Sequence, residues 1–317
     1  MSEFATIIVP TFRRQNLFLK CLNSLAIQDY EKEKYEIIAV HDGLDCDYDK
    51  QAINTVATQL KNFRFEKIAH GGVSRVRNHG IALARGELIL MLDDDCEAKE
   101  DWIKSLVAYM KKHPEVAAAG GTILAKSPQT FTQRYIDFKN LLRRPVRAAN
   151  GEIIALITAN ACFRKNIIDK VGGFREELSY SGGEDLDLSY RCRKFGTLSY
   201  CEEAIVYHYH RHSVGELVKQ HILYGRGVYL ACKLNNIDFS VLKFYNPTFF
   251  GLLKYFCYVS KRIFTVSLPE FRSKNLPLKL YLPYCYLDAV RKIAFIIGAA
   301  AERIRQHKNL AKSQLSK

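Results

Sequence analysis

The chain has 317 residues, 48% of them hydrophobic and 25% charged, which is the balance of an ordinary globular protein with a large core. This composition excludes an intrinsically disordered chain, a collagen-like repeat and a small disulfide scaffold. The longest stretch without Asp, Glu, Lys or Arg is the 11 residues Ile153–Phe163, whereas a membrane-spanning helix needs about 20. The sequence therefore argues against a polytopic membrane protein.

The cysteines and the N-terminal residues indicate a compartment. The nine cysteines are odd in number and include no CxxC pair, which is typical of reduced thiols rather than of a zinc module or a disulfide framework. The first residues, MSEFATIIVP, lack the basic and apolar regions of a secretory signal. We therefore expect a cytoplasmic protein.

The positive charge is concentrated near the C-terminus. The formal net charge is +14, and Ser240–Lys317 holds 14 Lys and Arg against 3 Asp and Glu, a net of +11. A nearly neutral body with a basic C-terminal region indicates a polyanionic partner, either nucleic acid or an anionic membrane surface. A merely solvated basic face is the alternative.

In the first 125 residues, short apolar runs alternate with amphipathic stretches. The runs predict strands at Thr6–Pro10, Tyr35–Val40, Phe63–Ile68, Leu88–Leu92 and Val116–Leu124. The amphipathic stretches predict helices at Asn16–Gln28, Ala52–Leu60, Ser74–Ala84 and Lys99–Lys112. Strands separated by helices predict an α/β fold, with a mostly parallel mixed sheet flanked by helices.

The alternation weakens beyond Ser127. A strand is predicted at Ile153–Phe163, helices at Asn166–Val171 and Leu186–Phe195, and short strands at Thr197–Tyr200 and Ile205–Tyr207. After His212 the chain becomes helical, aromatic and basic. We expect a catalytic domain over residues 1–239 and a helical basic region over residues 240–317.

Chemistry-bearing residues follow several of the predicted strands. Ligands of an open parallel sheet gather where its strands have their carboxyl ends. The first strand ends in Pro10-Thr11, the second in His41-Asp42-Gly43 and the fourth in Asp93-Asp94-Asp95. The third is followed by His70-Gly71-Gly72 and by a helix whose first turns carry Arg75, Arg77 and Asn78.

Asp93-Asp94-Asp95 is the strongest local signal, because adjacent carboxylates repel one another unless a cation or water neutralises them. In an extended segment, Asp93 and Asp95 would face one ligand and Asp94 would point elsewhere. Carboxylate ligands together with substrate phosphates suit Mg²⁺ or Mn²⁺. The alternative is a solvated turn in which an Asp caps a helix.

The motifs PTFRR, VHDG, VSRVRNHG, LDDD, GGEDLDLSYR and VYHYH occur in this order. From Ala5 to about Gly227 the chain thus resembles the inverting family-2 glycosyltransferases of GT-A fold. The resemblance implies a metal-dependent enzyme that moves a sugar from a nucleotide diphospho-sugar to a hydroxyl acceptor in cell-surface polysaccharide or glycolipid assembly.

On the donor side, the resemblance implies that Pro10, Thr11 and Arg13 line the nucleotide pocket. Asp42 would accept the imide hydrogen of a pyrimidine base, which favours a UDP-linked donor. The family often has Asp-Asp where this chain has His41-Asp42, so the base stays open, and Asp42 is alternatively a turn-forming residue before Gly43.

The same resemblance implies that Arg77 and Asn78 reach the diphosphate or the ribose, while Arg75 is equally well a surface arginine. Asp94 is placed among the donor-binding residues. Asp93 would address the ribose or the metal shell, and Asp95 would ligate Mn²⁺ or Mg²⁺ directly.

The family often supplies a further metal ligand at the position of His208. In an extended segment His208, His210 and His212 share a face, so the residues alone do not decide which of them is a ligand. The family position favours His208.

The second chemical centre is Glu184-Asp185. Inverting transfer needs a carboxylate to take the proton of the acceptor hydroxyl, and the resemblance assigns this general base to Asp185. Glu184 would orient the acceptor or the loop. Acidic residues in the first turn of a helix are the structural alternative.

Acceptor-side residues are implied by similarity as well. Asn160, in Thr158-Ala159-Asn160, and Trp102 match the family's acceptor segment and its aromatic residue after the metal motif, although Trp102 is equally well a core residue. Arg226, between Gly225 and Gly227, matches a segment that closes over the diphosphate.

Two other function classes compete with this one. A nucleotidyltransferase would share the sheet and acidic site, but it should carry a glycine-rich loop near the N-terminus, and PTFRRQN has no glycine. A nucleic-acid-binding protein would explain the charge but not the two acidic motifs. We therefore expect no nucleic-acid partner, and the oligomeric state stays open.

The basic C-terminal region suits a membrane surface. Val290, Ile293, Ile297, Ala301 and Ile304 fall on one helical stripe, with basic residues away from it, although Phe295 and Ile296 interrupt the polar side. We expect this region to lie on the cytoplasmic face of the membrane, which would suit a lipid-linked saccharide as acceptor. A helical subdomain packed on the core or on a second subunit is the alternative.

Overall fold

The computed structural model describes residues 4–143, 145–148, 150–179, 182–238 and 277–315. The chain divides into two units. Unit 1 consists of Met1–Pro128, Asn140–Ser179 and Glu184–His210. Unit 2 consists of Gln129–Lys139, Tyr180–Gly183 and Arg211–Lys317. The predicted boundary between residues 239 and 240 lies outside the described residues, so that division stays a prediction.

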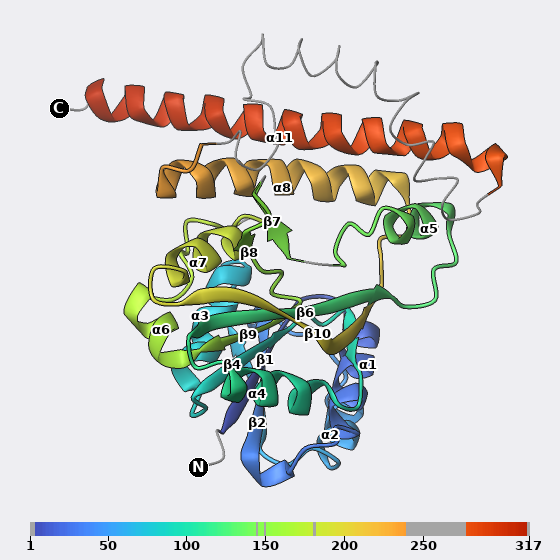
Figure 1. Ribbon diagram of the computed structural model, residues 1–317, viewed down its shortest axis with the longest axis vertical. Coiled ribbons are helices and arrows are strands. Elements are labelled where there is room, and N and C mark those ends of the chain that lie inside the picture. The colour runs from blue at the N-terminus through green and yellow to red at the C-terminus, as the bar shows by residue number, and fades with distance from the viewer. Residues whose placement is uncertain (1–3, 144, 149, 180–181, 239–276, 316–317) are drawn as a thin grey trace. The chain divides into compact units, whose positions relative to one another are not determined.

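Unit 1 is built on an eight-stranded sheet in the order β3-β2-β1-β4-β9-β6-β10-β5 (Figure 1). Its strands are β1 (Ala5–Thr11), β2 (Tyr35–Asp42), β3 (Phe63–Ile68), β4 (Leu88–Leu92), β5 (Cys96–Ala98), β6 (Val116–Ala125), β9 (Asn160–Arg164) and β10 (Thr197–His208). β1 is parallel to β2 and β4, β2 to β3, and β6 to β10. β9 is antiparallel to β4 and β6, and β5 to β10. The predicted mostly parallel mixed sheet is confirmed.

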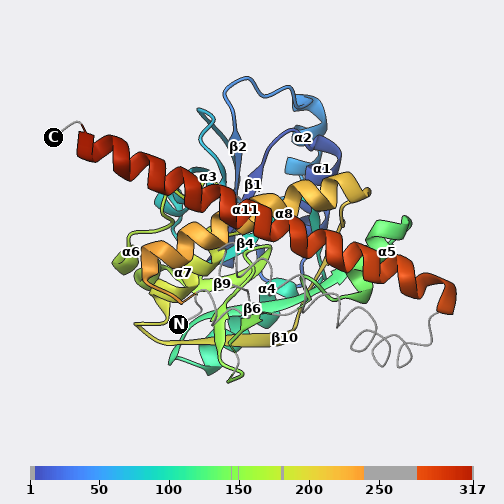
Figure 2. The same ribbon diagram turned by 90° about the horizontal axis from the view of Figure 1, so that it is seen from above.

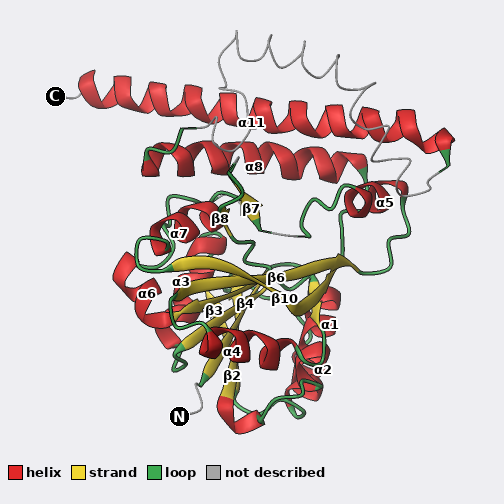
Figure 3. Cartoon of the chain, viewed as in Figure 1, coloured by secondary structure: helices red, strands yellow, loops and turns green. Residues whose placement is uncertain are grey.

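Helices cover both faces of this sheet (Figure 3). They are α1 (Gln15–Ala26), α2 (Lys50–Ala57), α3 (Val73–Leu83), α4 (Trp102–Lys112), α6 (Lys165–Val171) and α7 (Glu184–Cys192), with a short 3-10 turn η1 (Lys32–Lys34). The buried residues of α1, α2 and α4 belong to one core cluster, and those of α3, α6 and α7 to another. In β4, Leu90 lies in the first cluster, and Ile89 and Met91 lie in the second, so this strand is buried on both faces.

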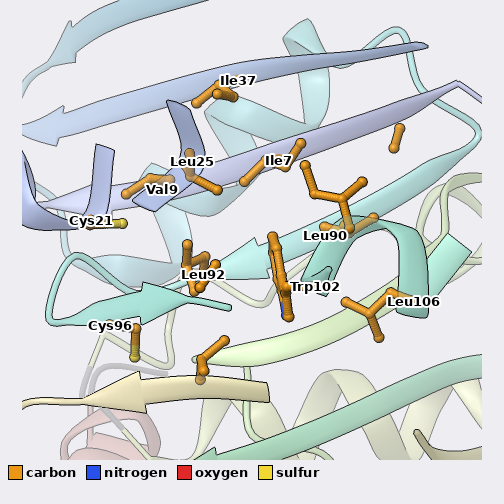
Figure 4. Packing of buried hydrophobic residues seen from close by; sticks show 14 of the residues in the cluster. Ile7, Val9, Cys21, Leu25, Ile37, Leu90, Leu92, Cys96, Trp102 and Leu106 are labelled. Atoms are coloured by element: carbon orange, nitrogen blue, oxygen red, sulfur yellow. The ribbon is translucent and has the colours of Figure 1, made fainter. Parts of the chain in front are cut away.

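The first cluster anchors the strands that lead to the acidic motif. Ile7 and Val9 of β1, Leu90 and Leu92 of β4 and Trp102 of α4 pack in it (Figure 4). None of these side chains has exposed surface, and burial of such a side chain stabilises a fold by about 1.5–3 kcal/mol. The end of β4, and with it the start of the acidic motif, is thereby fixed against the core.

Two predictions of strands were wrong. The predicted strand Ile153–Phe163 breaks into β8 (Ile153–Ala155) and β9, because the chain turns between them and Asn160 N–H bonds to Ile157 O at 3.0 Å. β8 instead pairs with β7 (Val146–Arg147) in a separate two-stranded sheet. Conversely, the two short strands predicted around residues 197–207 are one strand, β10, with an irregularity between Cys201 and Ile205.

Unit 2 is helical. It contains α5 (Phe131–Phe138), α8 (Val214–Asn235), η3 (Leu278–Leu280) and α11 (Tyr281–Leu315). The helices α8 and α11 lie side by side (Figures 1 and 2). A Cβ atom on Gly225 of α8 would lie 1.9 Å from Phe295 O, and one on Gly298 of α11 would lie 2.0 Å from Ile222 O, so both glycines permit this close packing. Within the described part of the chain, no helix is apolar over enough length to cross a membrane.

Candidate active site

The carboxyl ends of three neighbouring strands hold the first predicted site residues. Thr11 ends β1, Asp42 ends β2 and Asp93 follows β4. Because β1 is parallel to both β2 and β4, these ends meet at one edge of the sheet. The helix α3 adds Arg77 to this edge, and α7 adds Glu184 and Asp185.

The acidic motif is a turn, not an extended segment. Cys96 N–H donates to Asp93 O at 3.0 Å, which closes a turn directly after β4. The extended conformation predicted for this segment was therefore wrong, and in the turn Asp93 pairs with Arg77 whereas Asp94 and Asp95 share Arg14. The Asp93 side chain is 31% exposed, whereas those of Asp94 and Asp95 are only 4% and 3% exposed.

Arg14 is a cationic partner of both buried carboxylates. Its Nη1 donates to Asp95 Oδ2 and lies 3.4 Å from Asp94 Oδ1. The Thr11 hydroxyl donates to Asp94 Oδ2 at 2.8 Å. Burial raises the pKa of Asp94 to about 7, and the Arg14 charge opposes this rise. Arg13 of PTFRR was predicted as a site residue, whereas its neighbour Arg14 was not.

Arg77 of α3 joins the acidic turn to the acidic residues of α7. Its side chain is 3% exposed, with Nη2 donating to Asp93 Oδ1 at 2.9 Å and Nη1 donating to Glu184 Oε1 at 3.0 Å. The same Nη1 lies 3.5 Å from Asp185 Oδ1. Burial and the Asp185 charge raise the pKa of Glu184 to about 7, and Arg77 opposes them. The two predicted chemical centres therefore share one guanidinium and form one site.

Asp185 is positioned by the turn that precedes β9. Its Oδ2 accepts the backbone N–H of Thr158 at 3.1 Å, and its Oδ1 accepts the Thr158 hydroxyl at 2.5 Å. Burial raises the pKa of Asp185, while the Arg77 charge and the Thr158 hydrogen bonds favour the ionised form. The side chain stays 18% exposed, so this carboxylate combines a raised pKa with access from outside.

Asp95 and His208 belong to a group of buried side chains that could hold a metal ion. His208 Nε2 lies 3.4 Å from Asp95 Oδ1, and ligand atoms of Asp95, Cys96 and His208 all lie within 4.8 Å of one another. Burial and the neighbouring acids raise the pKa of the Cys96 thiol well above its usual range, so it stays neutral. A carboxylate and an imidazole therefore converge, a donor set that fits Mn²⁺ and, through the carboxylate oxygens, Mg²⁺.

The three histidines at and after the end of β10 have different surroundings. His210 Nδ1 lies 2.9 Å from His208 Nδ1, so the N–H of one ring donates a hydrogen bond to the nitrogen of the other. His212 belongs to unit 2, where its Nδ1 lies 3.3 Å from Gln133 Nε2. His208 contacts the acidic turn through Asp95.

Asp42 organises the loop between β3 and α3. Its two carboxylate oxygens accept the backbone N–H groups of Gly71 and Gly72 at 2.8 and 3.0 Å, and His70 Nδ1 lies 2.9 Å from Oδ2. Gly72 has φ +91°, a conformation that favours glycine. Oδ1 accepts the Gly71 N–H with one of its two lone pairs, so Asp42 supports the loop and keeps acceptor capacity for a base.

The other donor-side residues lie around the end of β1. Pro10 is buried in β1 beside Val40 of β2. The ring of Phe12 stacks on His70 with their centroids 4.9 Å apart, and the exposed Arg13 also lies over the Phe12 ring, with Cζ 4.9 Å from its centroid. These residues form an aromatic and cationic border next to the Asp42 loop.

Asn78 serves the backbone in this structure. Its Nδ2 donates to Phe174 O and its Oδ1 accepts Phe174 N–H, both at 2.8 Å, so the predicted contact with diphosphate or ribose would need this pairing to open. Arg75, on the same helix, is exposed. The Arg226 guanidinium, on α8 in unit 2, has Nε 3.6 Å from Glu302 Oε2 of α11.

Asn160 and Trp102 are interior residues. Trp102 Nε1 donates to Asn160 Oδ1 at 2.8 Å, and Asn160 Nδ2 donates to Thr122 O and Ala204 O at 2.9 and 2.8 Å. Their side chains are 0% and 1% exposed. Neither side chain is exposed enough to contact an acceptor as predicted, because both are used inside the core to hold β9 against its neighbours.

Comparisons with known proteins agree with this architecture. The family model "Glycosyl transferase family 2" matches residues 6–172, more than half of the chain. Glycosyltransferase AglE of Haloferax volcanii is 28% identical over 241 residues, 74% of this chain and 76% of that protein. Dolichyl N-acetyl-alpha-D-glucosaminyl phosphate 3-beta-D-2,3-diacetamido-2,3-dideoxy-beta-D-glucuronosyltransferase of Methanococcus voltae is 26% identical over 240 residues, 70% and 72% of the two chains.

A solved structure shares the fold over nearly the whole chain. The mannosyltransferase PcManGT of Pyrobaculum calidifontis, solved in complex with GDP-Man and Mn²⁺, superposes with a TM-score of 0.67 and 18% identity. The match covers 96% of this chain and 88% of that one. At this identity the likeness shows the fold alone.

Proposed function

The chain belongs to glycosyl transferase family 2, and on this premise we propose that it transfers a sugar from a nucleoside-diphosphate sugar to an acceptor hydroxyl with inversion at the anomeric carbon. The observation that carries the proposal is the Arg77 network. It holds Asp93 of the acidic turn and Glu184 of α7 on one guanidinium, with Asp185 3.5 Å away. The acidic residue proposed to act on the donor, Asp93, and those proposed to act on the acceptor, Glu184 and Asp185, therefore lie in one site.

Asp185 is the proposed general base. The acceptor oxygen forms a bond to the anomeric carbon as the bond from that carbon to the diphosphate oxygen breaks, and the electron pair of that bond leaves with the nucleoside diphosphate. The acceptor proton passes to the Asp185 carboxylate. The two Thr158 hydrogen bonds aim this carboxylate, and Glu184 holds Arg77 beside it.

Asp95 and His208, with Asp93 nearby, are the residues proposed to hold Mn²⁺ or Mg²⁺. The ion would neutralise the charge that develops on the leaving diphosphate. The convergent carboxylate and imidazole support this assignment, and the mannosyltransferase of the same fold was solved with Mn²⁺.

The donor is proposed to be UDP-linked. Asp42 supports this choice because it lies beside the Phe12–His70 stack and has acceptor capacity for the N3–H of uracil. The mannosyltransferase of the same fold was solved with GDP-Man, so a GDP-linked donor is the alternative to be tested. Thr11, Arg13 and Pro10 would border the same pocket.

The acceptor is proposed to be a lipid-linked saccharide presented at an anionic membrane surface. The Methanococcus voltae relative is named for a dolichyl phosphate saccharide. In α11, two residues of the predicted apolar stripe, Ile297 and Ile304, are 53% and 56% exposed. Phe295 and Ile296 are buried, which explains why they interrupted the polar side. The helix thus has one buried apolar side and one exposed apolar stripe.

The decisive test of transfer is a thermal-shift screen of UDP-sugars and GDP-mannose with and without Mn²⁺, followed by turnover of the donor that binds. Asp185→Asn should bind the donor normally and lose turnover by several orders of magnitude, whereas Asp95→Asn should lose the Mn²⁺-dependent shift. Binding of UDP-sugars that is indifferent to Mn²⁺, or full turnover by Asp185→Asn, would overturn the proposal.

Membrane association has a separate test. Flotation with liposomes containing phosphatidylserine should fall when Ile297 and Ile304 are replaced by Glu, and it should fall with rising salt. Phe195→Glu removes an equally exposed apolar residue of unit 1 and serves as the matched control. Equal flotation on neutral and anionic liposomes would contradict the membrane proposal without touching the transfer reaction.

A further inference from the structure

Arg14 lies where a cation would be needed. Its Nη1 bonds to Asp95 Oδ2, while the other oxygen of the same carboxylate lies 3.4 Å from His208 Nε2. The same Nη1 is 3.4 Å from Asp94 Oδ1. One guanidinium therefore neutralises the two carboxylates of the turn that are almost fully buried, and it does so on the proposed metal ligand itself.

The local backbone directs Arg14 to this position. Arg13 has φ +54°, in the left-handed region that non-glycine residues seldom adopt. Directly after it, the Arg14 N–H donates to the Tyr48 hydroxyl at 2.8 Å, and the Thr11 hydroxyl lies 2.8 Å from the same oxygen. This turn separates the two arginines, since Arg13 lies over Phe12 and Arg14 lies on the acidic turn.

The Arg14 side chain nevertheless has access to solvent. It is 38% exposed, in contrast with Arg77, which is 3% exposed and bound on both Nη atoms. A divalent cation ligated by Asp95 would stand within a few ångströms of the Arg14 charge, and like charges at such a separation repel strongly in a partly buried site. The guanidinium and the cation therefore compete for Asp95.

We propose that Arg14 is a built-in counter-ion, which neutralises Asp94 and Asp95 in the metal-free enzyme and yields Asp95 to the divalent cation when the donor binds. The displaced guanidinium then pairs with the donor's diphosphate, so the cation and the nucleotide assist each other's binding. This inference rests on the metal site of the proposed function. It makes Arg14 a positioning residue whose loss tightens metal binding rather than weakening it.

The test is a titration of Mn²⁺ alone, followed by the loss of the free-ion EPR signal, in wild type, Arg14→Gln, Lys20→Gln and Asp95→Asn. Lys20 is the matched control, because its Nζ lies 4.7 Å from the ring of Tyr209, beside the histidine pair, and its removal deletes one nearby charge. Arg14→Gln should bind Mn²⁺ about tenfold more tightly than wild type, within the usual range of couplings between sites. Lys20→Gln should match wild type.

A repeat with UDP present completes the test. UDP should tighten Mn²⁺ binding to wild type more than to Arg14→Gln, because only wild type has a guanidinium to move onto the diphosphate. If Arg14→Gln folds only when Mn²⁺ is added, the counter-ion role is supported directly, and Arg14→Lys, which keeps the charge, should then fold without metal and bind Mn²⁺ less tightly than Arg14→Gln.

The outcomes separate the inference from the proposed function. If Asp95→Asn abolishes Mn²⁺ binding while Arg14→Gln binds no more tightly than wild type, the metal site stands and the counter-ion inference is overturned. If Asp95→Asn binds Mn²⁺ as wild type does, the proposed metal site itself is wrong.

Discussion

Asp185 accepts two hydrogen bonds from a single residue, Thr158, one from the backbone N–H at 3.1 Å and one from the hydroxyl at 2.5 Å. Burial and hydrogen bonding act on this carboxylate in opposite directions. Burial raises the pKa of Asp185, and the Thr158 bonds stabilise its charge and hold the pKa down. Together with the Arg77 charge, Thr158 therefore determines how far the pH can fall before the proposed base is protonated.

The first prediction follows from this pair. Thr158→Val keeps the side-chain shape and removes the hydroxyl, so the pKa of Asp185 rises further and the acidic limb of the kcat/KM profile moves to higher pH. A hydrogen bond to a charged group contributes about 1.5–3 kcal/mol, so we expect a loss of about tenfold or more on the acidic limb. At high pH, where the base is ionised in both proteins, the rates should converge.

Thr55→Val, on the exposed side of α2, is the control. If Thr158→Val lowers kcat/KM equally at every pH and leaves the acidic limb at the same pH, the prediction is contradicted.

The second prediction concerns the buried Arg77–Glu184 pair. Arg77→Gln leaves three carboxylates near an uncharged side chain, and breaking a buried pair in this way typically costs about 3–5 kcal/mol of unfolding free energy. Adding Glu184→Gln removes one of those charges, so the double variant should be less destabilised than the sum of the single variants. Urea unfolding of the four proteins measures this coupling. Arg75→Gln with Glu184→Gln is the control pair and should be additive, since Arg75 is exposed.

Much of unit 1 could be predicted from sequence, because its signals are local. The run Leu88–Leu92 is apolar throughout, and the structure buries it on both faces of the sheet. The position of a polar residue directly after such a strand then determines which edge it reaches, which is why Asp93 and Asp42 could be assigned to one edge before their contacts were known. Asp185 was assigned to the site from its family motif, because hydrophobic periodicity does not show that it lies near Asp93.

The features that could not be predicted depend on contacts between residues far apart in the sequence or on the local backbone conformation. Trp102 and Asn160 are 58 residues apart, and only the folded chain shows that they satisfy each other inside the core. Arg13 and Arg14 are adjacent residues of the same type, so the sequence does not show which of them contacts the acidic turn. The left-handed backbone at Arg13 directs Arg14 to these carboxylates. The strand β5 has three residues, which are too few to show an alternating apolar pattern, so it was not predicted.

The third prediction concerns His210, whose ring lies against His208. If His208 donates its Nδ1–H to His210, its Nε2 is the unprotonated nitrogen and lies towards Asp95, as a metal ligand requires. His210→Phe keeps a ring but removes this acceptor, and loss of such a partner typically lowers metal affinity about 10–100-fold. Calorimetric titration of Mn²⁺ measures the change. His212→Gln should bind Mn²⁺ as wild type does, and a similar loss in both variants would show that His210 has no specific part in the metal site.

The last prediction concerns the pH dependence of stability, to which the buried His221 of α8 contributes. Its Nδ1–H donates to Leu217 O at 2.9 Å, and burial, assisted by the Arg291 charge, lowers its pKa to about 4. In the unfolded chain the pKa of a histidine is about 6.5, so between about pH 6.5 and 4 the unfolded state binds a proton that the folded state does not. Stability is therefore complete above about pH 6.5 and falls as the pH drops towards 4, by on the order of 3 kcal/mol from this residue.

His221→Leu should flatten the pH dependence of the urea midpoint across that window, whereas His307→Gln, an exposed histidine of α11, should leave the slope unchanged. Asp288 contributes in a lower range, because Arg291 and Lys292 hold the pKa of its carboxylate well below its usual value, and its stabilisation is lost only as the pH falls below about 4. The two residues are thus separable by pH, and an unchanged slope between pH 6.5 and 4 in His221→Leu would show that the proton uptake in this window belongs to other groups.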